Sequence, residues 1–276
     1  MTTPTTRGPH LAGRRFVATG CVLALAVAAC GGDDGGAADT ATTVEAGEDP
    51  TGRDEPVIDP GDGGAYRPAL DPATVADRID NPYLPFLPGA HWVYEGTSSD
   101  GTERIEVTVL DERRPVMGID AVVVRDTVSV AGELIEDTFD WYTQDADGNV
   151  WYLGEETAEY EDGEVVSTEG SWEAGVDGAL PGVVMWAEPM PGDAYRQEFY
   201  EGRAEDLAEV LAVGQRVTVA GRSHDDVVVI REWNPLEPDV VEQKSYAAGV
   251  GPVREEQTAG GDETVALVEH TPGATG

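Results

Sequence analysis

From Ile79 to about His270, apolar and aromatic residues alternate with polar ones in short runs separated by Gly, Asp and Pro. Side chains along a β-strand point alternately to the two faces of a sheet, so a period of two indicates antiparallel strands with one buried face. The pattern predicts an all-β domain. We expect strands near residues 91–95, 102–110, 121–130, 133–143, 150–154, 164–172, 194–200, 207–213, 215–220, 226–233, 240–247, 252–257 and 264–268.

Two segments also permit a helix. Ala204, Leu207, Ala208 and Leu211 have helical spacing, so a short helix there competes with the strand at 207–213. Residues 71–78 are expected to form a short helical segment that leads into the β domain.

The two halves of the β region resemble each other. Landmarks in the first half recur in the same order in the second half, at an offset between about 103 and 110 residues, which indicates an internal repeat. We therefore predict two meandering antiparallel lobes, about residues 82–160 and 185–270, that form one curved sheet or half-barrel. The matched landmarks are Pro88-Gly89 and Trp92 with Pro191-Gly192 and Tyr195, 94–96 with 200–202, 107–109 with 217–219, 122–124 with 227–229, Tyr142 with Tyr246, Gly148 with Gly251, and Val150 with Val253.

The N-terminal 29 residues are typical of an export signal. A polar, basic start is followed by the apolar run 16–29, which is too short to span a bilayer but suits a signal-peptide core. The end of this run, Val27-Ala28-Ala29-Cys30, resembles the bacterial lipobox. The resemblance implies cleavage before Cys30, a diacylglyceryl group on its sulfur, and anchoring at the extracytoplasmic face of the cell membrane. The alternative is an ordinary secretory signal that is cut elsewhere. Arg14-Arg15 leaves both the twin-arginine and the general export route open.

Residues 30–78 are rich in Gly, Asp, Glu, Thr, Ala and Pro and hold few residues that could form a core. We predict a disordered acidic tether there, the β domain over 79–270, and a short tail over 271–276. The formal charge of −37 at pH 7 disfavours nucleic acid as a partner. Both cysteines, Cys21 and Cys30, precede the β region, so no disulfide is expected within it.

Motifs of known chemistry are absent from the sequence. Ser223-His224-Asp225 has the residue types of a catalytic triad, but consecutive residues on a strand face opposite ways, so we interpret them as residues near a turn. The acidic run that begins at Asp145 lacks the glycine position of a calcium loop and favours a hairpin turn. Lys244 is the only lysine, a bias that suits GC-rich codons. We predict no catalytic residue, no metal site and no cofactor.

The stretch 174–193 is rich in Gly and Pro, weakly patterned and bordered by tryptophans. A long loop that carries apolar residues between two lobes can bind a ligand, or it can pack over the open end of the sheet. The candidate ligand-contacting residues are Trp172, Val183, Met185, Trp186 and Met190.

The opening of the β region, Asn81-Pro82-Tyr83-Leu84-Pro85-Phe86-Leu87-Pro88-Gly89 with Trp92 and 94–96, resembles a family of secreted bacterial lipoproteins of uncharacterised function. Segments 147–152 and 170–178 are similar to that family too. The C-terminal segments 217–219, 226–229 and 246–253 are distantly similar to LolA-type lipoprotein carriers, and this likeness implies a half-barrel with a lipid-carrying role. The sequence leaves three functions open. The first is a non-enzymatic binding module for a hydrophobic or lipid-like ligand. The alternatives are an envelope interaction or structural protein without a small-molecule site, and a hydrolase that uses unidentified carboxylates.

Overall fold

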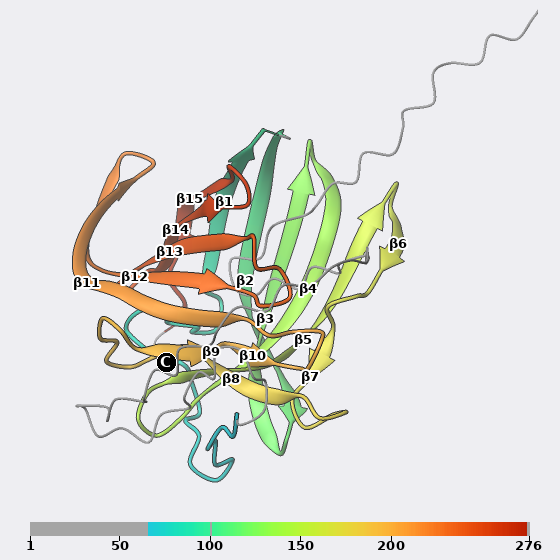
Figure 1. The fold of residues 1–276 in the computed structure, drawn as a ribbon, viewed down its shortest axis with the longest axis vertical. Coiled ribbons are helices and arrows are strands. Elements are labelled where there is room, and N and C mark those ends of the chain that lie inside the picture. Colours follow the sequence, from blue (N-terminus) through green and yellow to red (C-terminus); the bar gives the residue numbers. More distant parts are fainter. Residues whose placement is uncertain (1–65, 100, 275–276) are drawn as a thin grey trace, which may run out of the picture.

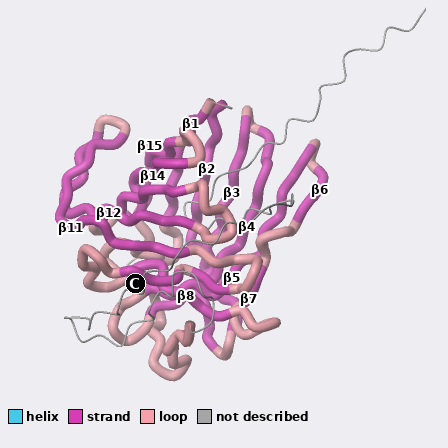
Figure 2. Tube along the Cα trace, in the orientation of Figure 1, coloured by secondary structure: helices cyan, strands magenta, loops and turns pink. Residues whose placement is uncertain are grey.

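A computed structural model describes residues 66–99 and 101–274. Cys30, the signal segment and the tether up to residue 65 lie outside the described residues, as do residues 275–276. The described chain forms fifteen strands and no helix (Figures 1 and 2). They are β1 (His91–Ser98), β2 (Gly101–Val116), β3 (Ile119–Val130), β4 (Glu133–Gln144), β5 (Val150–Glu161), β6 (Glu164–Ser167), β7 (Trp172–Glu173), β8 (Leu180–Met185), β9 (Ala194–Arg196), β10 (Glu198–Phe199), β11 (Leu207–Val219), β12 (Arg222–Trp233), β13 (Val241–Ala247), β14 (Gly251–Ala259) and β15 (Thr264–Thr271).

All strands belong to one antiparallel sheet in the order β10-β8-β5-β4-β3-β2-β1-β15-β14-β13-β12-β11-β9, with β6 and β7 paired to β5. The sheet is strongly curved and is not closed into a barrel (Figure 1). The predicted all-β class and curved sheet are confirmed. The helix considered at 204–211 is wrong, because β11 runs unbroken from Leu207 and pairs with β12 on one side and β9 on the other. Residues 71–78 form turns and bends instead of a helix.

The two meanders correspond strand for strand. The run β1-β2-β3-β4-β5 has the same pairing order as β9-β11-β12-β13-β14, and β15 lies between the two runs. Their openings also share two hydrogen bonds. Gly89 N–H donates to the Val109 carbonyl at 3.0 Å, and Gly192 N–H donates to the Val210 carbonyl at 2.8 Å. The amides of Val109 and Val210 then donate back to residues 90 and 193.

Strand register corrects part of the sequence alignment of the repeats. Val109 corresponds to Val210, so the run 217–219 is not the equivalent of 107–109. Tyr142 and Tyr246 are true equivalents, because they pair with Val122 and Val228 at matching positions. Short apolar runs of the two repeats can be aligned at many offsets in the sequence. The pairing of neighbouring strands identifies the correct alignment.

A single segment, residues 194–199, joins both edges of the sheet at one end. Its first part, β9, pairs with β11, and its last part, β10, pairs with β8 (Figure 1). We call it the bridge segment. A Cβ on Gly182 of β8 would clash with the backbone of this segment, including the Glu198 nitrogen at 2.6 Å, so glycine permits the close approach.

The segment that precedes β1 packs on the domain. Asn81 donates from its side-chain amide to the carbonyls of Gly148 and Trp186, while its side-chain oxygen accepts from the amides of residues 83 and 84. Tyr66 is only 6% exposed, and its hydroxyl donates to the Pro181 carbonyl at 2.8 Å. Tyr66 and the half-buried Leu70 and Val75 therefore pack on the domain, within a stretch that composition assigns to the tether. A lone tyrosine among Gly and Pro gives little signal in sequence, although its burial is worth as much as that of a core residue.

Candidate functional site

The inner face of the curved sheet carries two matching sets of polar residues, one from each repeat. Cross-strand pairs place Asp126 beside Thr138 and Asp140 beside Glu155 in the first repeat. In the second repeat, the same positions pair Glu232 with Glu242 and Lys244 with Glu255. All eight side chains are buried. Lys244 therefore occupies the position in the second repeat that Asp140 occupies in the first.

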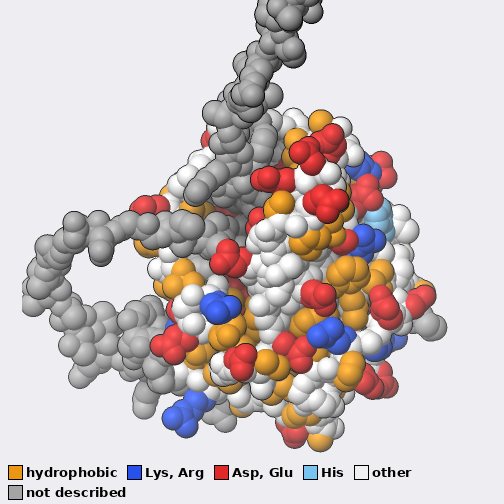
Figure 3. Space-filling view, turned by 90° about the vertical axis from the view of Figure 1, so that its right-hand side faces the viewer, with side chains coloured by type: hydrophobic (Ala, Val, Ile, Leu, Met, Phe, Trp, Pro, Cys, Tyr) orange, Lys and Arg blue, Asp and Glu red, His pale blue; other side chains and the backbone are white. Residues whose placement is uncertain are grey.

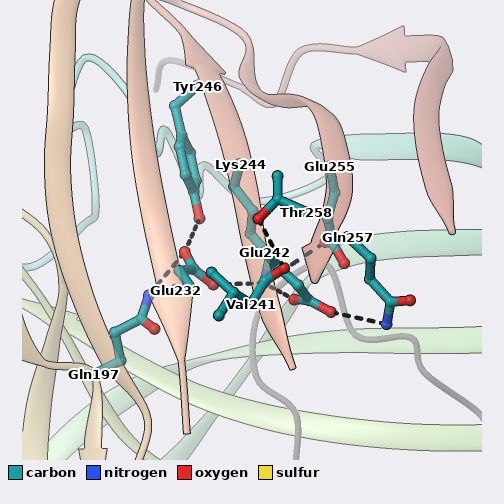
Figure 4. A network of polar contacts seen from close by, with 9 residues as sticks. All are labelled: Gln197, Glu232, Val241, Glu242, Lys244, Tyr246, Glu255, Gln257 and Thr258. Atoms are coloured by element: carbon teal, nitrogen blue, oxygen red, sulfur yellow. Dashed lines mark hydrogen bonds and ion pairs between the residues drawn. The ribbon is translucent and has the colours of Figure 1, made fainter. Parts of the chain in front are cut away.

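The second set is an ion cluster around one lysine, which we call the lysine cluster (Figure 4). Lys244 Nζ lies 2.7 Å from a Glu232 oxygen, 3.6 Å from Glu255 and 4.0 Å from Glu242. Burial alone would lower the pKa of Lys244, but the three glutamates outweigh it and hold the pKa well above its usual value. Gln197 of the bridge segment donates to Glu232 at 3.0 Å, and so ties the cluster to both edges of the sheet.

The first set has no such cation at its centre. Its core, which we call the acid cluster, consists of Asp140, Glu155, Glu198 and Asp206. Glu198 comes from the bridge segment, and Asp206 follows the exposed turn at 201–203. A β-bulge at Leu153 shifts the register of β5 against β4, so that both Tyr152 and Glu155 point to the inner face. Tyr152 donates its hydroxyl to Asp140 at 2.8 Å.

Each carboxyl group of the acid cluster has a raised pKa. Burial raises the pKa of Asp140 to about 7, with Glu136 adding to the effect and the Tyr152 hydroxyl opposing it. Burial also raises the pKa of Glu198 to about 7, against the lowering effect of the Asp206 and Trp172 side chains. Burial and neighbouring acids raise the pKa values of Glu155 and Asp206 well above their usual values, and Lys244 opposes the effect at Asp206. These groups therefore hold protons at a pH where ordinary carboxyl groups are ionised.

The structure distributes the predicted ligand-contacting residues over several elements. Val183 and Met185 lie in β8, which pairs with β5, so the stretch 174–193 is not one continuous loop. Trp186 is buried against Tyr195, with ring centroids 5.4 Å apart, and Met190 lies in the turn before β9, where its amide donates to Asp193 at 2.7 Å.

Trp172 is the predicted residue that reaches the acid cluster. It pairs with Glu155 in the sheet, packs edge-on against the Tyr152 ring at 5.3 Å, and faces Glu198. The sequence singled out this tryptophan because it borders an irregular stretch, and it missed the carboxyl groups around it. Two signals in the sequence could have indicated these carboxyl groups. One is an acidic residue at a strand position where the alternation predicts a buried side chain. The other is the match of Asp140 and Glu155 to Lys244 and Glu255, once the repeats are aligned by strand register.

Other sequence motifs have structural explanations. The Asp145 carboxylate accepts hydrogen bonds from the amides of residues 147 and 149 and from the Trp151 indole, as in a hairpin turn. Ser223, His224 and Asp225 lie in β12 next to its turn, where Asp225 pairs with Arg216 across the hairpin. Among the described residues, no group of three or more His, Cys, Asp or Glu side chains could hold a metal ion.

The outer surface mixes acidic, apolar and a few basic side chains. The face in Figure 3 shows scattered Asp and Glu side chains with isolated Arg side chains between them and no broad basic area. Across residues 66–99 and 101–274, no helix is long and apolar enough to cross a membrane.

Comparison with known proteins gives two solved structures of similar fold. One is a protein assigned as exported, with a YmcC-like fold, from Bacteroides fragilis NCTC 9343, at 18% identity and a TM-score of 0.42, covering 68% of this chain and 98% of the other. The second is a protein assigned as a lipoprotein from Parabacteroides distasonis ATCC 8503, at 14% identity and a TM-score of 0.39, covering 71% and 100%. At these TM-scores, neither likeness bears on the function of this chain. No protein-family model and no curated protein matches it.

Proposed function

We propose that this protein is a lipid-anchored binding module at the extracytoplasmic face of the bacterial cell membrane. The lipobox at Val27–Cys30 supports the anchor, and the inner face of the curved sheet supports the binding role. The observation that carries the proposal is the set of buried carboxyl groups beside Trp172, Tyr152 and Tyr142. Buried acids are costly without partners, and a sheet that needed only a filled core would be more stable with apolar residues there.

Two features of the inner face support a particular class of ligand. Aromatic rings on the inner face suit the hydrophobic or lipid-like ligand inferred from sequence, since rings offer flat apolar contacts. The neighbouring carboxyl groups require that such a ligand also carry polar groups, because a purely apolar one would leave them without partners.

The anchor is tested by Cys30→Ala. The variant cannot be acylated, so it should move from the membrane fraction to the culture medium when it is produced in its own host. Immunoblots of the fractions measure the change, with Cys21→Ala as the matched control that stays in the membrane fraction. A Cys30→Ala protein that still sediments with membranes would show that the anchor lies elsewhere.

The binding role is tested by native mass spectrometry. The full chain with Cys30→Ala, collected from its own host without detergent, should carry a reproducible extra mass from a bound small molecule. Trp172→Ala should remove that mass, because Trp172 lies against the acid cluster. Trp233→Ala, at a half-buried tryptophan that stacks on Arg231, is the control that should keep it. A clean mass for the parent protein would favour the envelope interaction role.

A further inference from the structure

The lysine cluster contains a buried cation, and the matching position in the first repeat does not. In the second repeat, an ammonium group fills the space between carboxylates at positions 232, 242 and 255. The first repeat has the same pairing frame, with acids at 126 and 155 and a hydroxyl at 138. At the central position it presents the Asp140 carboxyl in place of an ammonium. The bridge segment and the following turn then add Glu198 and Asp206 to the same place.

Atoms of the acid cluster are also left without partners. Glu155 is 3% exposed, and its Oε1 atom accepts no hydrogen bond from any described residue. Glu198 is 0% exposed, and neither of its carboxyl oxygens accepts a hydrogen bond of good geometry within the described chain, although Asp206 and Trp172 face it. The charged groups that act on Glu155 are all acids: Asp140, Glu136, Asp206 and Asp126. Buried oxygen atoms that accept no hydrogen bond are rare in protein interiors. They therefore indicate a place where a hydrogen-bond donor is expected to bind.

We infer that the acid cluster binds the ammonium or guanidinium group of an organic ligand, in the role that Lys244 has in the second repeat. Such a group supplies one positive charge and N–H donors for Glu155 Oε1 and for Asp140 Oδ2, while the other Asp140 oxygen already accepts from Tyr152. A metal ion is disfavoured, because no group of acids in the described chain could hold one. Asp206 is the most exposed member at 8%, and it follows the exposed turn at 201–203, which makes this the side of the cluster nearest to solvent. Trp172 and Tyr152 provide aromatic contacts for the rest of the ligand.

This inference rests on the proposed binding function and names the ligand group. It is tested by titrating the full chain carrying Cys30→Ala with butylguanidinium, butylammonium and the neutral butylurea, by calorimetry at pH 8. At least one of the two cations should bind with a single saturable site, and butylurea should give no saturable heat. Glu155→Gln should weaken that binding at least tenfold, because it removes the acid that can give up its proton to balance the charge of the ligand and whose Oε1 has no other partner.

Two further variants serve as a control and as a second test of the acid cluster. Glu256→Gln alters an exposed acid of β14 that pairs with Arg254, and should leave binding unchanged. Asp206→Asn alters the most exposed member of the cluster, and repeats the test if Glu155→Gln does not fold. Equal binding of butylurea, no binding of either cation, or full binding by both cluster variants would overturn the inference. A co-purified ligand without a basic nitrogen would overturn it too, while leaving the binding module itself intact.

Discussion

Lys244→Met should lower the free energy of unfolding by about 3–5 kcal/mol at pH 8, the usual cost of leaving buried charges without their partner. Methionine has a similar length and leaves little cavity, so the effect comes from charge. The substitution leaves Glu232, Glu242 and Glu255 together in a buried space. Burial already raises the pKa values of Glu242 and Glu255 against the opposing effect of Lys244, and loss of the lysine raises them further. Urea unfolding followed by tryptophan fluorescence measures the loss.

Acid should partly rescue this variant. At lower pH, Glu242 and Glu255 take up protons more readily because their pKa values are already raised, so at pH 5 the difference from the parent protein should shrink. The matched control is Arg254→Gln on the adjacent strand, whose ion pair with Glu256 is about 39% and 40% exposed. An exposed pair of this kind is worth roughly 0–1 kcal/mol. Equal losses for Lys244→Met and Arg254→Gln would mean that the lysine cluster contributes no more than a surface pair.

The free energy of unfolding should fall by several kcal/mol as the pH rises from 5 to 8. Asp140 and Glu198 have pKa values of about 7 in the folded protein, whereas carboxyl groups of an unfolded chain titrate near pH ~4. Between these values the folded state holds more protons than the unfolded state, so each group lowers stability by about 1.4 kcal/mol per pH unit. Their contribution is complete below pH ~4, is lost progressively up to pH ~7, and changes little beyond. Thermal melts across this range measure it.

Asp140→Asn isolates one of these groups from the general repulsion of a chain with formal charge −37. Asparagine keeps an oxygen that can accept the Tyr152 hydroxyl, and it does not titrate. The variant should match the parent protein below pH ~4, where the Asp140 carboxyl group is protonated in the folded and the unfolded state. It should exceed the parent's stability at pH 8, with a slope that is smaller by about 1.4 kcal/mol per pH unit between pH ~4 and pH ~7. An unchanged slope would show that Asp140 titrates as an ordinary carboxyl group.

The sequence alone predicts the class and curvature of this fold well, because period-two alternation is a local property. It predicts β11 less well. Helical spacing is also present there, at Ala204, Leu207, Ala208 and Leu211. The segment forms a strand because β11 pairs with β12 on one side and β9 on the other. Tertiary pairing of this kind leaves no local signal. The same holds for β8, whose six residues Leu180–Met185 include a proline and a glycine and look like a loop.

The candidate site is harder to predict, since its members are charged residues at buried positions. In a chain with 54 acids, Glu155 and Glu198 look like any surface glutamate. A bulge turns Glu155 inward, and a bridge between distant strands brings Glu198 to it. Trp172 could be singled out because tryptophans are few. Lys244 carried a similar clue, as the only lysine of the chain, but without register its three partners could not be named.

The first strand of the sheet is completed by the last. β1 lies between β2 and β15, and β15 also pairs with β14, so the two repeats are joined through a strand that follows both of them in the sequence. His91 is partnered by Thr271, some 180 residues later in the chain. Contacts of such long sequence separation form slowly, because the intervening chain must first be brought together. Each repeat therefore has one sheet edge without a partner, β1 in the first and β14 in the second, until β15 has been synthesised and has paired with both strands.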